Sequence, residues 1–233
     1  MTTDQLNHKI LLCETALDEY QKSGHFTVLN LVNETKLTAS DIYSLFDDKN
    51  SILDFYYPVL LLRYETMIEE IEDFDSYTIS EKTSNFIYTM FDMMDERREF
   101  VEDSFHERVI KAGSKSEFFI QTKEFFHRFF TTDPNISVSA GFLMKDYFYH
   151  FLTKQYVHLV DYWLTDDSVG YERSMALTDK MTSFIEEIAY NKILDKGFDL
   201  AKYIVTQEDI TNKIPCVGNW VTEIFKDESA VNE

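Results

Sequence analysis

The sequence predicts an all-helical protein, and three observations carry this prediction. Glycine and proline are scarce, with 6 Gly and 3 Pro among 233 residues, so few positions interrupt a helix. In most segments apolar residues recur at the three- and four-residue spacing of a helix. No alternation of apolar and polar residues around a tight turn indicates a β-hairpin. We expect an N-terminal three-helix domain with a helix-turn-helix over residues 1–50, and a C-terminal helical bundle over residues 51–233.

The N-terminal domain is expected to hold three helices. Gly24 is placed to end the first helix, and Thr27 is placed to cap the start of the second. Lys36 and Leu37 form a turn, after which Thr38 is placed to cap the third helix. These helices are expected over residues 4–23, 28–34 and 39–46.

The remaining chain is expected to continue as helices joined by short polar links. Pro58 lies inside the first of them, where it should kink the helix or remove one hydrogen bond. The polar loop 165–170 joins the two longest late helices, and the tail stretch Pro215–Trp220 is apolar enough to dock on a surface. The helices are expected over residues 51–72, 80–95, 97–111, 116–131, 142–164, 171–194 and 198–205.

Residues 31–53 resemble the helix-turn-helix of the Tet repressor family. The positions that fall in register without a gap are Leu37, Thr38, Tyr43, Phe46, Lys49, Ile52 and Leu53. The turn glycine of that family is replaced here by Lys36, and Asp41 stands where a small residue is common. The resemblance implies a transcriptional regulator that binds a palindromic double-stranded DNA operator as a homodimer. It also implies a C-terminal domain that binds a small molecule.

Seven N-terminal side chains are candidate DNA contacts. Hydroxyls at the helix starts, a tyrosine and a lysine would meet phosphates, and small side chains on the third helix would face base edges. These candidates are Thr27, Thr38, Ala39, Ser40, Tyr43, Ser44 and Lys49. In the alternative interpretation Tyr43 and Phe46 are core residues and Thr38 is only a cap, in a domain that keeps the fold without binding DNA.

The charge of the chain favours that alternative. Its formal net charge is −20, which argues against loose attraction to nucleic acid or anionic membranes. Residues 1–57 hold four lysines, no arginine and nine acidic residues, a net charge of −5. A DNA-binding domain of this charge must gather its lysines on one face. The second hypothesis is therefore a lipid- or isoprenoid-binding protein without DNA binding, similar to the lipid-binding proteins of ubiquinone biosynthesis that share the Tet repressor fold.

Aromatic residues are abundant in the C-terminal region, and the whole chain holds 20 Phe and 14 Tyr. Mixed with adaptable methionines, they suit a pocket for a small apolar ligand, although packing of the core alone explains them as well. The candidate ligand-binding residues are Phe86, Met90, Met93, Phe126, Phe130, Phe148, Phe151 and Trp163.

The helix expected over residues 171–194 carries an apolar stripe. It is formed by Met175, Leu177, Met181, Phe184, Ile185 and Ile188. With the helix expected over 142–164, it would build a four-helix bundle between two subunits, as the resemblance implies. Alternatively, the stripe closes the core of the monomer itself.

Other classes of function find little support in the sequence. There is no glycine-rich phosphate loop and no nucleophile elbow, so we expect neither an enzyme nor a cofactor. The pairs Glu102/His106 and His150/His158 lack a third ligand at a suitable spacing, so we expect no metal site.

The expected location is the cytoplasm, without a membrane partner. Cys13 and Cys216 fit no metal or redox motif and are expected to be free thiols. The first residues do not have the pattern of a signal peptide, and the longest apolar stretch, residues 56–62, is far too short to span a membrane.

Overall fold

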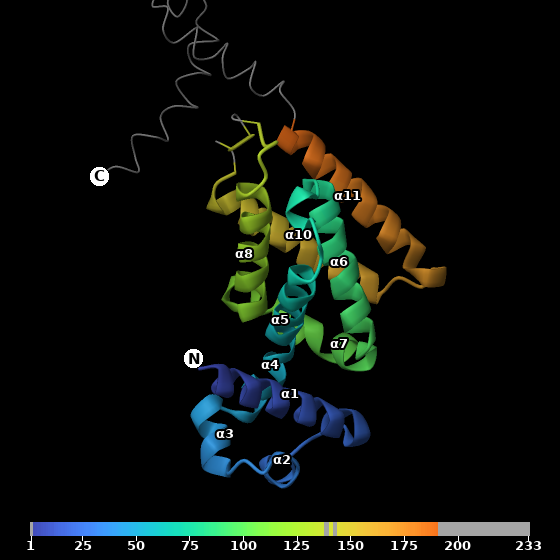
Figure 1. Cartoon of the computed structure of the whole chain (residues 1–233). Coiled ribbons are helices and arrows are strands. Elements are labelled where there is room, and N and C mark those ends of the chain that lie inside the picture. Colours follow the sequence, from blue (N-terminus) through green and yellow to red (C-terminus); the bar gives the residue numbers. More distant parts are fainter. Residues whose placement is uncertain (1, 138–139, 142–143, 191–233) are drawn as a thin grey trace, which may run out of the picture. The chain divides into compact units, whose positions relative to one another are not determined.

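The computed structural model describes residues 2–137, 140–141 and 144–190, and every regular element in these ranges is a helix (Figure 1). The predicted all-helical class is therefore confirmed. The predictions for residues 198–205, for Cys216 and for Pro215–Trp220 concern residues outside the described ranges.

The chain packs as two compact units. One comprises Met1–Asp133 and Asp146–Ser183, and the other comprises Pro134–Lys145 and Phe184–Glu233. Within the second unit, the backbone N–H of Ser137 donates to the carbonyl oxygen of Ala189 at 2.9 Å. The boundary predicted after residue 50 lies inside the first unit, and the division into two functional domains stays a prediction.

Three helices form the N-terminal part of the first unit: α1 Thr3–Ser23, α2 Val28–Thr35 and α3 Ala39–Leu45. They lie together at one end of this unit (Figure 1). Each helix turns an apolar side toward a shared core, in which Leu12, Leu31 and Ile42 are completely buried. Because α2 and α3 have only eight and seven residues, they are too short to be stable alone, and this burial holds the helix-turn-helix together.

The long helix predicted from residue 51 is broken earlier than expected. It forms α4 Lys49–Asp54 and α5 Tyr56–Glu69, and the break lies at Phe55. The break fits the effect predicted for Pro58, which has no N–H to donate to the carbonyl of Asp54 four residues earlier. The backbone at Phe55 keeps helical angles, with φ −69° and ψ −13°, so the interruption is local.

The middle of the chain contains α6 Ile79–Asp95, α7 Arg98–Phe105 and α8 Glu117–Thr131, with short 3-10 turns at Phe74–Ser76 and Gly113–Lys115. The single helix predicted over 97–111 instead continues from α7 into a π-helical turn, His106–Ile110. Its widened hydrogen bond runs from the N–H of Lys111 to the carbonyl of His106 at 2.9 Å.

The two late helices are α10 Asp146–Leu164 and α11 Glu172–Tyr190, joined by a polar loop that ends in the 3-10 turn Val169–Tyr171. The carboxylate of Asp166 braces this loop. It accepts hydrogen bonds from the backbone and hydroxyl of Ser168 at 3.0 and 2.6 Å, and from those of Ser174 at 2.8 and 2.7 Å.

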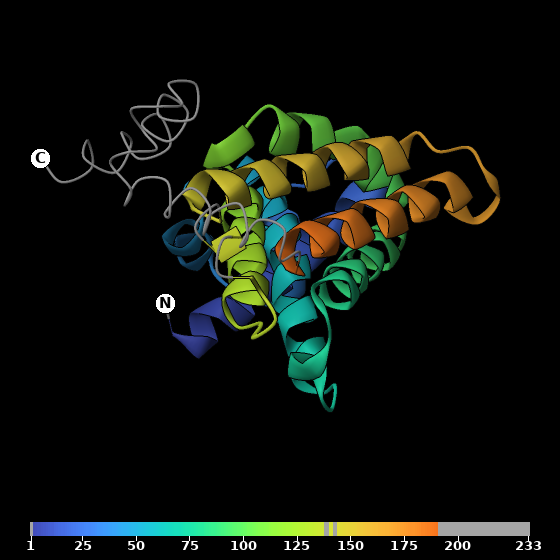
Figure 2. The ribbon, with the colours of Figure 1, turned by 90° about the horizontal axis from the view of Figure 1, so that it is seen from above.

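Helix α5 forms the centre of the first unit and lies between α6 and α8 in both views (Figures 1 and 2). Seven of its residues are buried. Phe86 of α6 is completely buried beside it, and the centroids of five other aromatic rings lie 5.0–6.4 Å from its own. These neighbours are Tyr64, Phe125, Phe126, Phe129 and Tyr156. Edge-to-face contacts dominate, which is the favourable arrangement for aromatic pairs.

Candidate nucleic-acid interface

The two short helices of the helix-turn-helix begin at threonine caps, as predicted. The hydroxyl of Thr27 accepts from the N–H of Asn30 at 3.1 Å, and that of Thr38 accepts from the N–H of Asp41 at 3.2 Å. In return, the carboxylate of Asp41 accepts from the N–H of Thr38 at 2.9 Å and from its hydroxyl at 2.6 Å. This reciprocal pair is a capping box, here completed by Asp rather than Glu or Gln.

Asp41 is therefore bound to the start of its own helix. The side-chain and backbone hydrogen bonds from Thr38 lower the pKa of its carboxyl below the ordinary value, so it is ionised at neutral pH. The negative charge of Asp41 at this end of α3 compensates the partial positive charge of the helix N-terminus. An approaching phosphate would meet a helix end that already has an anionic cap.

The turn between α2 and α3 depends on a left-handed lysine. Lys36 has φ 60° and ψ 10°, and its N–H closes α2 by donating to the carbonyl of Val32 at 3.1 Å. Glycine adopts this conformation without steric cost, whereas the Cβ of another residue crowds the following carbonyl. Lys36 therefore holds a conformation that strains a residue with a Cβ.

Four of the candidate DNA contacts lie exposed on α3. They are Ala39, Ser40, Tyr43 and Ser44. The side chain of Tyr43 is 56% exposed, whereas Phe46 is only 5% exposed and packs edge-to-face on Phe55. Of the two aromatic residues that could have been core residues, Phe46 is one and Tyr43 is not. The tyrosine hydroxyl can therefore reach a partner outside the protein.

The remaining candidates, Thr27 and Lys49, lie at the starts of α2 and α4. The ammonium of Lys49 lies 4.5 Å from the centroid of the Phe26 ring, a cation–π contact that fixes the lysine near the domain surface. Lys9 makes similar contacts with Phe46 and Phe55, at 4.9 and 5.0 Å. No local sequence pattern predicts these contacts, because they join residues far apart in the sequence.

Acidic residues in this domain partly serve as caps. Besides Asp41, Asp48 accepts a hydrogen bond from the N–H of Ser51 at 2.9 Å and so caps α4. Glu19 pairs with Lys22 at 2.9 Å. Part of the domain's negative charge is thus used for its own local structure rather than being spread at random over the surface.

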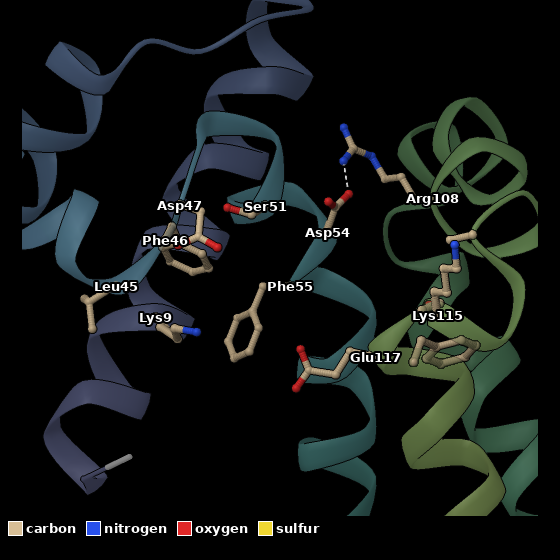
Figure 3. A pocket seen from close by; sticks show the side chains of 13 residues that line it. Lys9, Leu45, Phe46, Asp47, Ser51, Asp54, Phe55, Arg108, Lys115 and Glu117 are labelled. Carbon is tan, nitrogen blue, oxygen red and sulfur yellow. Dashed lines mark hydrogen bonds and ion pairs between the residues drawn. The ribbon is translucent and has the colours of Figure 1, made fainter.

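A pocket of about 450 Å³ lies beside the helix-turn-helix, at its junction with α8 (Figure 3). Lys9, Phe46 and Phe55 line one side, and Glu117 of α8 lies opposite. In Figure 3, Arg108 of the π-helical turn reaches the carboxylate of Asp54.

Arg108 connects the two sides of this junction. Besides its ion pair with Asp54, it donates to the carbonyl of Asn50 at 3.2 Å. Both partners belong to α4, more than fifty residues earlier in the chain. No local pattern in the sequence predicts such a contact.

The candidate ligand-binding residues do not all come together. Phe86, Met90 and Phe126 are buried in the aromatic core, whereas Phe151 is 56% exposed. Phe130 packs on Phe148 with centroids 5.5 Å apart, and Trp163 stacks on Phe91 at 4.8 Å. Met93 lines a different, open groove of about 560 Å³ on the surface between α5 and α6.

Helix α11 packs with its polar side inward. Ser174, Thr178 and Thr182 are buried at successive turns, and Thr182 exchanges hydrogen bonds with Ser80 and Ser84 of α6 at 3.2 and 2.9 Å. Apolar residues of the same helix are exposed instead; they include Leu177, Phe184 and Ile188. This orientation is the reverse of that expected for a helix that only closes a monomer's core.

Residues 82–204 match the family described as Tetracyclin repressor-like, C-terminal domain. This match covers more than half of the chain and begins beyond the helix-turn-helix, so it is independent of the resemblance in residues 31–53. The chain belongs to the Tet repressor-like family. Tet repressor-like proteins are typically regulators rather than enzymes, and the helical order of this chain fits that family. No curated protein matches the sequence.

Two further findings concern the described residues. Across residues 2–137, 140–141 and 144–190, no helix is both long and apolar enough to cross a bilayer. Within the same ranges, no group of three or more His, Cys, Asp or Glu side chains is arranged to hold a metal ion.

Proposed function

We propose that this Tet repressor-like protein is a DNA-binding transcriptional regulator that works as a homodimer and responds to a small apolar ligand. Residues 1–50 would bind a palindromic operator, and residues 51–233 would bind the ligand and form the dimer. Ligand binding would shift helices of the C-terminal domain and change the spacing of the two recognition helices.

The exposed face of α3 carries the DNA-binding part of this proposal. It combines a capped helix start with small side chains, Ala39, Ser40 and Ser44, that allow close approach to base edges. Tyr43, exposed on the same helix, and Lys49, at the start of α4, would contact phosphates. Because phosphate contacts are independent of sequence, these two would position the domain, whereas the small residues would select the site.

Fluorescence anisotropy with the DNA that flanks the protein's own gene tests this role. We expect Lys49→Ala to weaken binding to all sequences alike and to lower the salt dependence of the affinity by about one unit of slope. Lys22→Ala is the matched control, since it removes the same charge from a lysine that is already paired with Glu19. Equal effects of both variants would mean that only net charge matters.

The orientation of α11 supports the dimer. The polar residues of α11 face the interior of the protein, and its apolar residues face outward, where they are unfavourably exposed to water. In a dimer with a two-fold axis, the same apolar residues of the second subunit would pack against them. We propose that Leu177, Phe184 and Ile188 contribute to this interface.

A lipid- or isoprenoid-binding protein without DNA binding is the second candidate. The observation that favours it is the acidity of the helix-turn-helix, including the ionised Asp41 at the start of α3. Absence of binding to flanking or random DNA at low salt, in the wild type and in Asp41→Asn alike, would favour this candidate.

A further inference from the structure

Among the residues that the structure describes, three hydroxyl groups of the first unit lie buried without a hydrogen-bond partner. They belong to Thr83 of α6, Thr122 of α8 and Tyr156 of α10. All three residues are at most 4% exposed. By contrast, the hydroxyl of Thr153, also fully buried on α10, donates to the carbonyl of Tyr149 one turn earlier at 2.8 Å. A threonine in a helix can thus satisfy itself locally, and Thr83 and Thr122 do not.

The three hydroxyls belong to one cluster of rings. The ring of Tyr156 lies 6.2 Å from Phe118 and 6.1 Å from Phe126 between centroids. Thr122 lies one helical turn from each of these phenylalanines, so it shares their face of α8. Tyr156 also lies 5.2 Å from Phe86, and Thr83 precedes Phe86 by one turn on α6.

An unpaired hydroxyl inside an aromatic core is unfavourable, because it has left water without gaining a protein partner. Burial raises the pKa of Tyr156, so its hydroxyl is protonated and can donate at any physiological pH. The surrounding phenylalanine rings offer neither an acceptor nor a countercharge. A neutral acceptor brought in from outside would satisfy the tyrosine, whereas an ionised one would be buried without compensation.

We propose that the small apolar ligand carries one neutral oxygen, a carbonyl or hydroxyl, that accepts a hydrogen bond from Tyr156 and lies next to Thr122. This inference rests on the proposed ligand binding and adds the chemical class to it: an aromatic or aliphatic molecule with a single ketone-, ester- or alcohol-like oxygen. Hydrocarbons would enter the same site less tightly.

Two probes of nearly the same shape test the inference in the full-length protein. Acetophenone has a carbonyl where α-methylstyrene has a methylene group. Isothermal titration should give an affinity for the ketone about fivefold higher than for the hydrocarbon, the worth of one hydrogen bond. Tyr156→Phe should remove this difference and leave the affinity for α-methylstyrene unchanged.

Stability without ligand provides a second readout. Removing the unpaired hydroxyl in Tyr156→Phe should raise the folded-to-unfolded ratio by about fivefold in urea unfolding. Tyr64→Phe is the matched control: Tyr64 packs on the same Phe86 ring, but its hydroxyl donates to Asn85 at 3.0 Å. This variant should lower the ratio and keep the preference for the ketone.

The experiment distinguishes failure of the proposed hydrogen bond to Tyr156 from failure of the proposed ligand site. Equal affinities for the two probes would overturn the polar contact but leave the ligand site in place. If neither probe bound, both the contact and the apolar ligand site would be overturned. A ligand-free Tyr156→Phe that is destabilised like Tyr64→Phe would show that the hydroxyl already has a partner, such as a buried water, and would overturn the inference.

Discussion

The strained turn of the helix-turn-helix gives a quantitative prediction. Lys36→Gly should stabilise the protein, because Lys36 holds a left-handed conformation with φ 60° that glycine adopts freely. The substitution keeps the backbone hydrogen bond to Val32, and Lys36 is exposed, so no core packing is lost.

Two opposing terms set the size of the effect. A left-handed residue with a Cβ costs about 1–2 kcal/mol relative to glycine in the folded state. Glycine, however, loses more conformational freedom on folding, which costs about 0.5–1 kcal/mol. The net stabilisation should therefore be roughly 0.5–1 kcal/mol.

Equilibrium urea unfolding of the wild type, Lys36→Gly and Lys36→Ala measures this difference. The alanine variant removes the same charge but keeps the Cβ, so it should stay within about 0.5 kcal/mol of the wild type. Gly24 has φ 73° at the end of α1 and offers the reverse control, in which Gly24→Ala should be destabilising. A glycine variant no more stable than the alanine variant would refute the assignment of strain to Lys36.

Three further predictions follow from other contacts. Asp41→Asn should lower stability, because its carboxylate caps α3, and should raise DNA affinity if α3 contacts phosphates; unfolding and anisotropy measure the two effects separately, and an unchanged stability would contradict the cap. Phe184→Asp should turn a dimer into the 27.6 kDa monomer in light scattering at micromolar concentration, whereas a monomeric wild type would count against the bundle. Hydrogen bonds from Ser168 and Ser174 hold the pKa of Asp166 well below its ordinary value of 3.8, so its stabilisation is present above that pH and is lost as the pH falls below it. Asp166→Asn should therefore be less stable at neutral pH and less sensitive to acid, and parallel acid-unfolding curves of the two proteins would contradict this.

Local chemistry made most of the fold predictable. The threonine caps at positions 27 and 38 and the glycine at position 24 set the helix ends within one residue of those observed. The break at Phe55 follows from Pro58, which cannot donate a backbone hydrogen bond to the preceding turn. The π-helical turn, by contrast, has no sequence signature.

The candidate site was predictable only where neighbours along the chain define it. The cap at Thr38 is predicted from its place before the third helix and is confirmed, with Asp41 completing a capping box three residues later. Contacts between distant segments, such as Arg108 with Asp54 or Lys9 with Phe46, arise from tertiary packing and leave no periodic trace. The unpaired hydroxyl of Tyr156 also emerges only when the surroundings of each buried group are known.

The ion pair between Arg108 and Asp54 of α4 affects how the protein should respond to salt. The carboxylate partner, Asp54, is half exposed, so added ions screen this pair, whereas the buried rings nearby keep their contacts. Raising the salt concentration would thus weaken the ion pair that anchors α4 and would also weaken any binding to DNA. A plot of the logarithm of DNA affinity against the logarithm of salt concentration would then curve downward. Replacing Arg108 by an uncharged residue would make this plot straight.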